Sequence, residues 1–179
     1  MSNEVKVDAE SIKKSAEDLV ELIKLRTFPF GMKLFEDVDD MLSIKGLRTP
    51  SDGKFFTTCQ LVTQVRTAGF TLGIVQNNLR PGSSCGANIG LEIVPEDVSS
   101  GQKMTGVWFG NQEAAAKHQA QMPRVEAGKY TGLAASPLRT GRLDPPDICL
   151  FYASPGQMIL FINGLQYHNS VSYTHLRAH

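Results

Sequence analysis

The sequence has no excess of charge of either sign and no long apolar run. Eighteen Lys and Arg residues balance eighteen Asp and Glu residues, so the formal net charge at neutral pH is zero. A balanced chain has no overall attraction for nucleic acid or anionic lipid, and we predict neither nucleic acid nor membrane as a partner. No run of eighteen apolar residues occurs, which predicts no membrane span. The polar N-terminus, MSNEVKVD, is not that of a secretory signal.

Cysteine is scarce, and the signature motifs of common enzyme classes are missing. The three cysteines, Cys59, Cys85 and Cys149, are too few and too scattered for the disulfide framework of a small secreted protein. A reducing cytoplasm is therefore the expected location. No nucleophile elbow, phosphate-binding loop or dinucleotide-binding glycine motif is present. No motif in the chain names a substrate or a reaction.

The last nine residues, VSYTHLRAH (171–179), differ in kind from the rest of the chain. They resemble the translation of a transposase adapter used to prepare sequencing libraries. We therefore predict that residues 171–179 are a non-native tail. Residues 1–170 are then expected to form a single domain that is truncated at its C-terminal end. Without the tail, His118 and His168 are the only histidines left for imidazole chemistry.

Apolar periodicity predicts helices that alternate with strands. Period-3.6 patterns favour helices, and alternating or continuous apolar runs favour strands. The helices are expected in residues 8–26, 57–69, 85–93, 111–122 and 154–168, and the strands in 28–37, 70–75, 102–110, 128–138 and 147–154. This interleaving predicts an α/β or α+β domain in which helices pack on a mixed sheet. The run DICLFYAS (147–154) is apolar on both faces, which places it at the centre of that sheet.

Several residues mark the ends of these helices. Asp8 and Asn111 are suited to N-cap two of them, and Thr57 or Thr58 is suited to cap a third. Ser154 precedes Pro155 and stands three residues before Gln157, which is the pattern of a capping box with proline at the first helical position.

Cys59 and Cys85 share a local design. Each follows two hydroxyl residues, in TTC and SSC, and each opens a segment with a helical pattern. Free N–H groups and the positive dipole end of a helix favour a thiolate, the form that binds metals and attacks electrophiles. Gly86 removes a side chain next to Cys85 and leaves room for a ligand or backbone. Cys149 lies in an apolar strand, and we expect it to be an inert core thiol.

The order of several phrases resembles that of a known prokaryotic family. These phrases are RTFPFGMKLF, TTCQLVTQVRTAG, SSCGANIGLEI, MPRVEAGKYTGLAASPL and PPDICLFYASPGQMILFINGLQY. The chain resembles the domain of unknown function 169 family, typical of archaea and anaerobic bacteria, over nearly all of residues 9–168. The resemblance implies that Cys59 and Cys85 are the cysteines of the family pattern. It also implies a further cysteine in the region that follows this chain.

Three functional hypotheses follow. The leading one is a cytoplasmic accessory or redox protein that binds an iron–sulfur cluster or zinc, with Cys59 and Cys85 as thiolate ligands and the remaining ligands expected outside this fragment. The second is an enzyme with a nucleophilic or redox-active thiol, for which Cys85 is the preferred residue because of its glycine-rich surroundings. The third is a metal-free module that holds a small anion at the helix N-terminus in ASPGQ (153–157).

Overall fold

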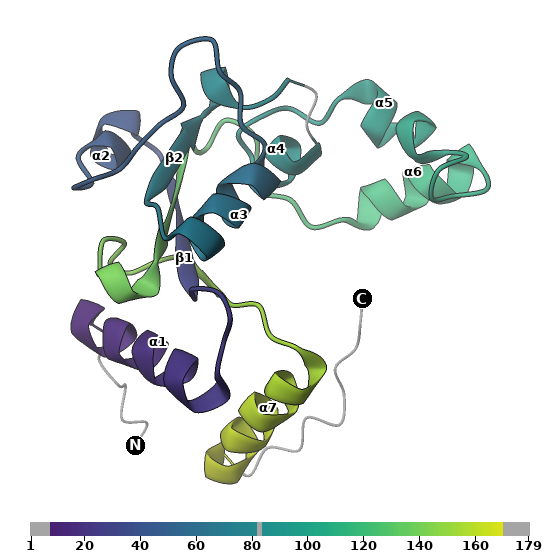
Figure 1. Cartoon of the computed structure of the whole chain (residues 1–179). Coiled ribbons are helices and arrows are strands. Elements are labelled where there is room, and N and C mark those ends of the chain that lie inside the picture. The colour runs from purple at the N-terminus through teal and green to yellow at the C-terminus, as the bar shows by residue number, and fades with distance from the viewer. Residues whose placement is uncertain (1–7, 82–83, 170–179) are drawn as a thin grey trace, which may run out of the picture.

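A four-stranded antiparallel sheet forms the centre of the molecule (Figure 1). The structure, a computed structural model, describes residues 8–81 and 84–169, so the 171–179 tail lies outside the described residues. The strands are β1 (Phe30–Phe35), β2 (Leu72–Val75), β3 (Gly132–Pro137) and β4 (Ile148–Leu150). Their order across the sheet is β2-β3-β1-β4, and each neighbouring pair is antiparallel. Single-residue parallel bridges, such as Arg48 to Leu72, extend its edge.

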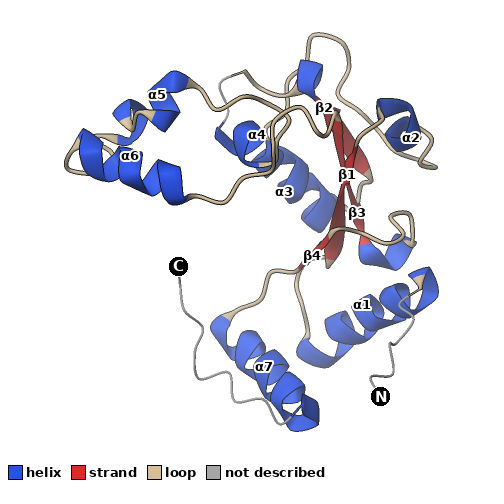
Figure 2. Cartoon of the chain, turned by 180° about the vertical axis from the view of Figure 1, so that it is seen from behind, coloured by secondary structure: helices blue, strands red, loops and turns tan. Residues whose placement is uncertain are grey.

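Helices surround this sheet and complete the α/β or α+β fold that the sequence predicted. The α-helices are α1 (Ala9–Ile23), α2 (Val38–Leu42), α3 (Thr58–Ala68), α4 (Ser84–Asn88), α5 (Glu96–Ser99), α6 (Gln112–Gln121) and α7 (Pro155–Asn169). Short 3₁₀ helices are η1 (Gln76–Asn78), η2 (Gln102–Met104) and η3 (Leu138–Thr140). In Figures 1 and 2, α1 and α7 lie at one end of the molecule, whereas α5 and α6 form an arm that projects to one side.

The two faces of the sheet pack against different helices. Successive side chains of a strand point to opposite faces, so Leu133 and Ala134 belong to two different clusters. Leu133 is part of the main core with Leu61 and Val65 of α3, both fully buried. Ala134 packs with the fully buried Met41 of α2 on the other face. The sheet therefore fixes α3, and with it Cys59, against the main core.

The predicted caps at the starts of four helices agree with the structure, whereas the predicted helix 85–93 ends early, at Asn88 of α4. Asp8 and Asn111 accept hydrogen bonds as the N-caps of α1 and α6, and Thr57 is the N-cap of α3. Ser154 and Gln157 exchange the two bonds of a capping box, with N···O distances of 2.8 and 3.4 Å. These local expectations are confirmed because cap chemistry depends on neighbours within three residues.

Two expectations about strands are wrong. The segment 147–154 does not lie at the sheet centre: only its first part forms β4, an edge strand paired with β1 alone, and Cys149 is exposed. The predicted strand at 102–110 is η2 followed by a tight reversal. There Gly106, at φ +77°, donates its N–H to the carbonyl of Phe109 at 2.8 Å, so the chain pairs with itself. Trp108 is consequently exposed.

No helix in the described ranges is long and apolar enough to cross a membrane.

Candidate functional site

Cys59 is the second residue of α3, and its position follows from the cap and the core. Thr57 and Gln60 form a capping box, in which the Gln60 N–H donates to Thr57 Oγ1 at 3.1 Å and the Thr57 N–H donates to Gln60 Oε1 at 2.9 Å. Leu61 and Val65 point into the core. Helical spacing then directs Cys59 outward, and its residue is exposed.

Cys85 belongs to α4, a short helix that follows the polar turn after β2. Gly86 and Ala87, the next two residues, are buried, and the side chain of the buried Leu79 packs directly against Gly86. The glycine therefore admits a core leucine at this position. Cys85 itself is half-buried.

The structure brings the two cysteines to one pocket, although they lie 26 positions apart on separate helices. The pocket has a volume of about 190 Å³. Its lining residues are Thr58, Cys59, Val62, Thr63, Arg66, Cys85 and Tyr152. Neither cysteine is in a disulfide. Two thiols on rigid elements thus face a common space large enough for a small molecule.

Arg66 and Tyr152 form the other side of this pocket. The Arg66 guanidinium carbon lies 4.0 Å from the centroid of the Tyr152 ring, a cation–π contact that holds the charge beside the thiols. Arg66 Nε and Thr58 Oγ1 are buried, and neither has a hydrogen-bond partner among the described residues. Buried polar atoms of this kind call for a polar partner. The pocket therefore combines thiols with a fixed positive charge and unused polar groups.

The described residues supply only part of the ligand set of a zinc or iron–sulfur centre, so Cys59 and Cys85 as metal ligands stay a prediction. Both types of site ordinarily take four ligands, with thiolate or imidazole groups predominating. The pocket supplies two thiols, and within the described ranges no group of three or more His, Cys, Asp or Glu side chains could hold a metal ion. His118 is an exposed residue of α6 whose ring centroid lies 5.2 Å from that of Phe109. It lies outside this pocket.

A family comparison covers almost the whole chain, including both cysteines. The model of one family, described as an uncharacterised ArCR, matches residues 18–176. The chain belongs to the domain of unknown function 169 family. No curated protein and no solved structure matches it. Cys59, Cys85 and Tyr152 all lie within the residues that match the domain of unknown function 169 family. The non-native tail and the truncation stay predictions.

The third cysteine of this family member lies elsewhere. Cys149 lines a separate apolar groove of about 520 Å³ between α1, β4 and α7. Burial of the sulfur against that groove raises the pKa of the Cys149 thiol, although the residue lies on an edge strand and is exposed. The prediction that Cys149 lies in the core was therefore wrong, because the residue is exposed. A raised pKa lowers the fraction of reactive thiolate at neutral pH.

The ASPGQ turn lines a third, more polar pocket together with Lys24 and Arg26. Gln157 Nε2 donates to the carbonyls of Ile23 and Lys24, at 2.9 and 2.6 Å. Its Oε1 accepts the Ser154 N–H, so the Gln157 side chain already occupies part of this helix end. The anion site at this turn stays a prediction.

The sequence interpretation did not single out Arg66 or Tyr152. A signal for Arg66 existed, since Cys59, Val62, Thr63 and Arg66 follow the i, i+3, i+4, i+7 spacing of one helical face. Tyr152 carried no such signal. It reaches the pocket from the segment between β4 and α7, far away in sequence.

Proposed function

We propose that this protein is a cytoplasmic thiol–disulfide redox protein that acts on a small anionic disulfide. The observation that carries the proposal is that Cys59 and Cys85 line one pocket with Arg66. Two thiols at a common pocket suit thiol–disulfide exchange, a two-electron reaction that uses the two sulfur atoms and requires no metal ion. The guanidinium suits a substrate with a carboxylate near its sulfur, because arginine pairs well with carboxylate.

The exchange has two steps. The Cys59 thiolate attacks one sulfur of the disulfide RSSR, forms a mixed disulfide and releases one thiolate, RS⁻. The Cys85 thiolate then attacks the Cys59 sulfur, so that an internal disulfide forms and the second RS⁻ leaves. Two electrons pass from the two protein thiolates to RSSR. We assign the first attack to Cys59, and no longer to Cys85, because Cys59 is exposed whereas Cys85 is half-buried.

The test uses the reduced protein with dithiodipropionate, an anionic disulfide, and with bis(hydroxyethyl) disulfide, its neutral counterpart. We expect the wild type to release two thiols per chain and to form a Cys59–Cys85 disulfide that peptide mass spectrometry identifies. Cys85→Ser is expected to stop at the mixed disulfide on Cys59, and Cys59→Ser is expected to abolish rapid release. Cys149→Ser is the matched control and should behave as the wild type.

The two substrates test the role of Arg66. Reaction with the anionic disulfide should be faster than with the neutral one, and Arg66→Gln should remove the difference. A disulfide that includes Cys149, or mixed disulfides alone on the wild type, would contradict the proposal. If metal copurifies with the wild type prepared without oxygen, and not with Cys59→Ser prepared in the same way, the result would instead support the metal-binding hypothesis.

A further inference from the structure

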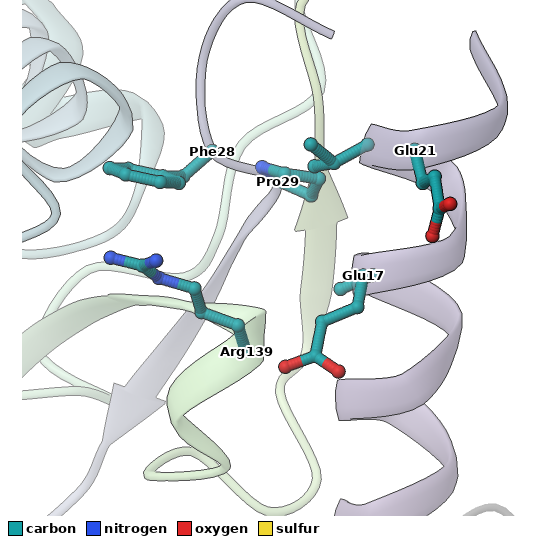
Figure 3. Close-up of a pocket in the computed structure, with 7 residues that line it drawn as sticks. Glu17, Glu21, Phe28, Pro29 and Arg139 are labelled. Carbon is teal, nitrogen blue, oxygen red and sulfur yellow. The ribbon is translucent and has the colours of Figure 1, made fainter. Parts of the chain in front are cut away.

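A further pocket lies between α1, the segment 28–29 that leads into β1, and η3 (Figure 3). It has a volume of about 220 Å³. Its apolar wall consists of Ala16, Val20 and Pro29, and its remaining lining residues are Glu17, Glu21, Phe28 and Arg139. None of these residues lines the thiol pocket. The two pockets are therefore separate sites.

The pocket carries charges of opposite sign on its two sides. Glu17 and Glu21 stand one turn apart on α1, whereas Arg139 comes from η3 and reaches beneath the Phe28 ring (Figure 3). Two carboxylates at i and i+4 repel each other. Neither forms an ion pair or hydrogen bond with any described residue. They are available to a positive group from outside the chain.

Arg139 is held away from these glutamates. Its guanidinium carbon lies 4.0 Å from the centroid of the Phe28 ring, in a cation–π contact. No N···O distance of 4.0 Å or less joins Arg139 to Glu17 or Glu21. Opposite charges in the same pocket therefore do not neutralise each other directly.

We propose that this pocket binds an amino acid with an apolar side chain. Its ammonium group pairs with Glu17 and Glu21, and its carboxylate pairs with Arg139, the geometry that a guanidinium favours. Its side chain packs on Ala16, Val20 and Pro29. A zwitterion satisfies both charged sides at once, whereas a simple amine or a simple carboxylate leaves one side without a partner.

The experiment is isothermal titration of the full chain with L-leucine, 3-methylbutylamine, which lacks the carboxylate, and 4-methylpentanoate, which lacks the amine. We expect L-leucine to bind, and each analogue to bind more weakly by about tenfold or more, because each analogue leaves one charged side of the pocket without its hydrogen-bond partner. Absence of L-leucine binding would overturn the proposal. Equal binding of either analogue would also overturn it.

Variants locate the site. Glu17→Gln and Arg139→Gln should each weaken L-leucine binding by about tenfold or more, by the same reasoning. Asp18→Asn is the matched control, because Asp18 is an exposed acid of α1 that does not line the pocket. Unchanged affinity in Glu17→Gln and Arg139→Gln, with wild-type circular dichroism, would place any binding elsewhere. The double variant Cys59→Ser/Cys85→Ser should bind L-leucine normally, which separates this proposal from the redox function.

Discussion

Gly86 lies where a β-carbon would overlap the buried side chain of Leu79. That same β-carbon would stand 2.6 Å from Glu92 Oε2, closer than real β-carbons approach an oxygen. Leu79 is only 1% exposed, so it has little room to move. The position of Cys85, the preceding residue, thus depends on core packing beneath it.

We expect Gly86→Ala to lower the free energy of unfolding by about 1–3 kcal/mol, because overpacking forces side chains out of place. Chemical denaturation measures this change. The matched control is Gly164→Ala in α7, where an added β-carbon meets nothing within 4 Å. Alanine in an open helical position should instead stabilise by about 0.5–1 kcal/mol. A neutral Gly86→Ala would show that Leu79 repacks freely.

Glu92 gives a pH-dependent prediction. Desolvation by burial raises the pKa of this carboxyl above its ordinary value of 4.5, and Oε2 has no hydrogen-bond partner among the described residues. Since the folded-state pKa is raised, the associated stability is present below the ordinary pKa and is lost as the pH rises through the folded-state value.

The substitution Glu92→Gln removes the loss of stability that ionisation of Glu92 causes as the pH rises. We expect the variant to be more stable than the wild type at neutral pH and the advantage to vanish well below pH 4.5. Denaturant unfolding across this range measures the difference, and Glu126→Gln, at an exposed position, is the control. A constant difference at all pH values would indicate a packing effect rather than titration.

At the scale of the elements, the N-cap of α3 holds the first turn of the helix, where Cys59 lies. Thr57 accepts the Gln60 N–H, and Gln60 returns a bond to the Thr57 N–H. We expect Thr57→Ala to cost about 1 kcal/mol of stability through loss of this N-cap. It should also raise hydrogen exchange in the first turn of α3, where Cys59 lies. Thr63→Ala, at an exposed position within α3, should change stability less. Equal effects of both substitutions would contradict a capping role.

The sequence predicted elements well where the deciding interactions are local. The caps at Asp8, Thr57, Asn111 and Ser154 follow this rule. The errors at 102–110 and 147–154 arose because an apolar run does not tell whether a neighbouring strand exists. β4 is apolar on both faces, yet β1 is its sole partner strand in the described sheet. Its outer side is left exposed for that reason.

On the scale of the whole molecule, α7 is joined to the rest by few contacts. Its residues Ile159, Leu160 and Tyr167 are exposed, between 58% and 86%. The Phe151 and Phe161 rings meet edge to face at 4.9 Å near its first turns. Gln157 binds the last carbonyls of α1, at Ile23 and Lys24. This side chain therefore orients α7 against α1.

We expect Gln157→Ala to increase hydrogen exchange in α7 and at the end of α1 while β3 keeps its protection. The reason is that β3 lies at the buried centre of the sheet, whereas α7 depends on a few surface bonds. Gln166→Ala, on the same helix and away from that capping box, is the control. Loss of protection in β3 would show that α7 and the sheet unfold together.

The sequence predicted Cys59 and Cys85 as candidate site residues, but it did not predict that they line the same pocket. The repeated hydroxyl–hydroxyl–cysteine pattern drew attention to Cys59 and Cys85, and it depends on neighbours in the chain. Their common pocket depends on how α3 and α4, two helices from separate parts of the chain, are placed in the fold. The charged partner Arg66 and its aromatic support Tyr152 come from segments separated by more than half the matched family region.

The sequence by itself determined the caps of four helices, most of the alternation of helices with strands, and the family, because each depends on residue order and short-range bonding. Only the tertiary structure decided that Cys149 lies on a sheet edge, that Cys59 and Cys85 share a pocket, and that Arg139 lines the same pocket as two glutamates without an ion pair to either. These features arise from packing between segments distant in the chain. A local sequence pattern does not specify which distant segments pack against each other.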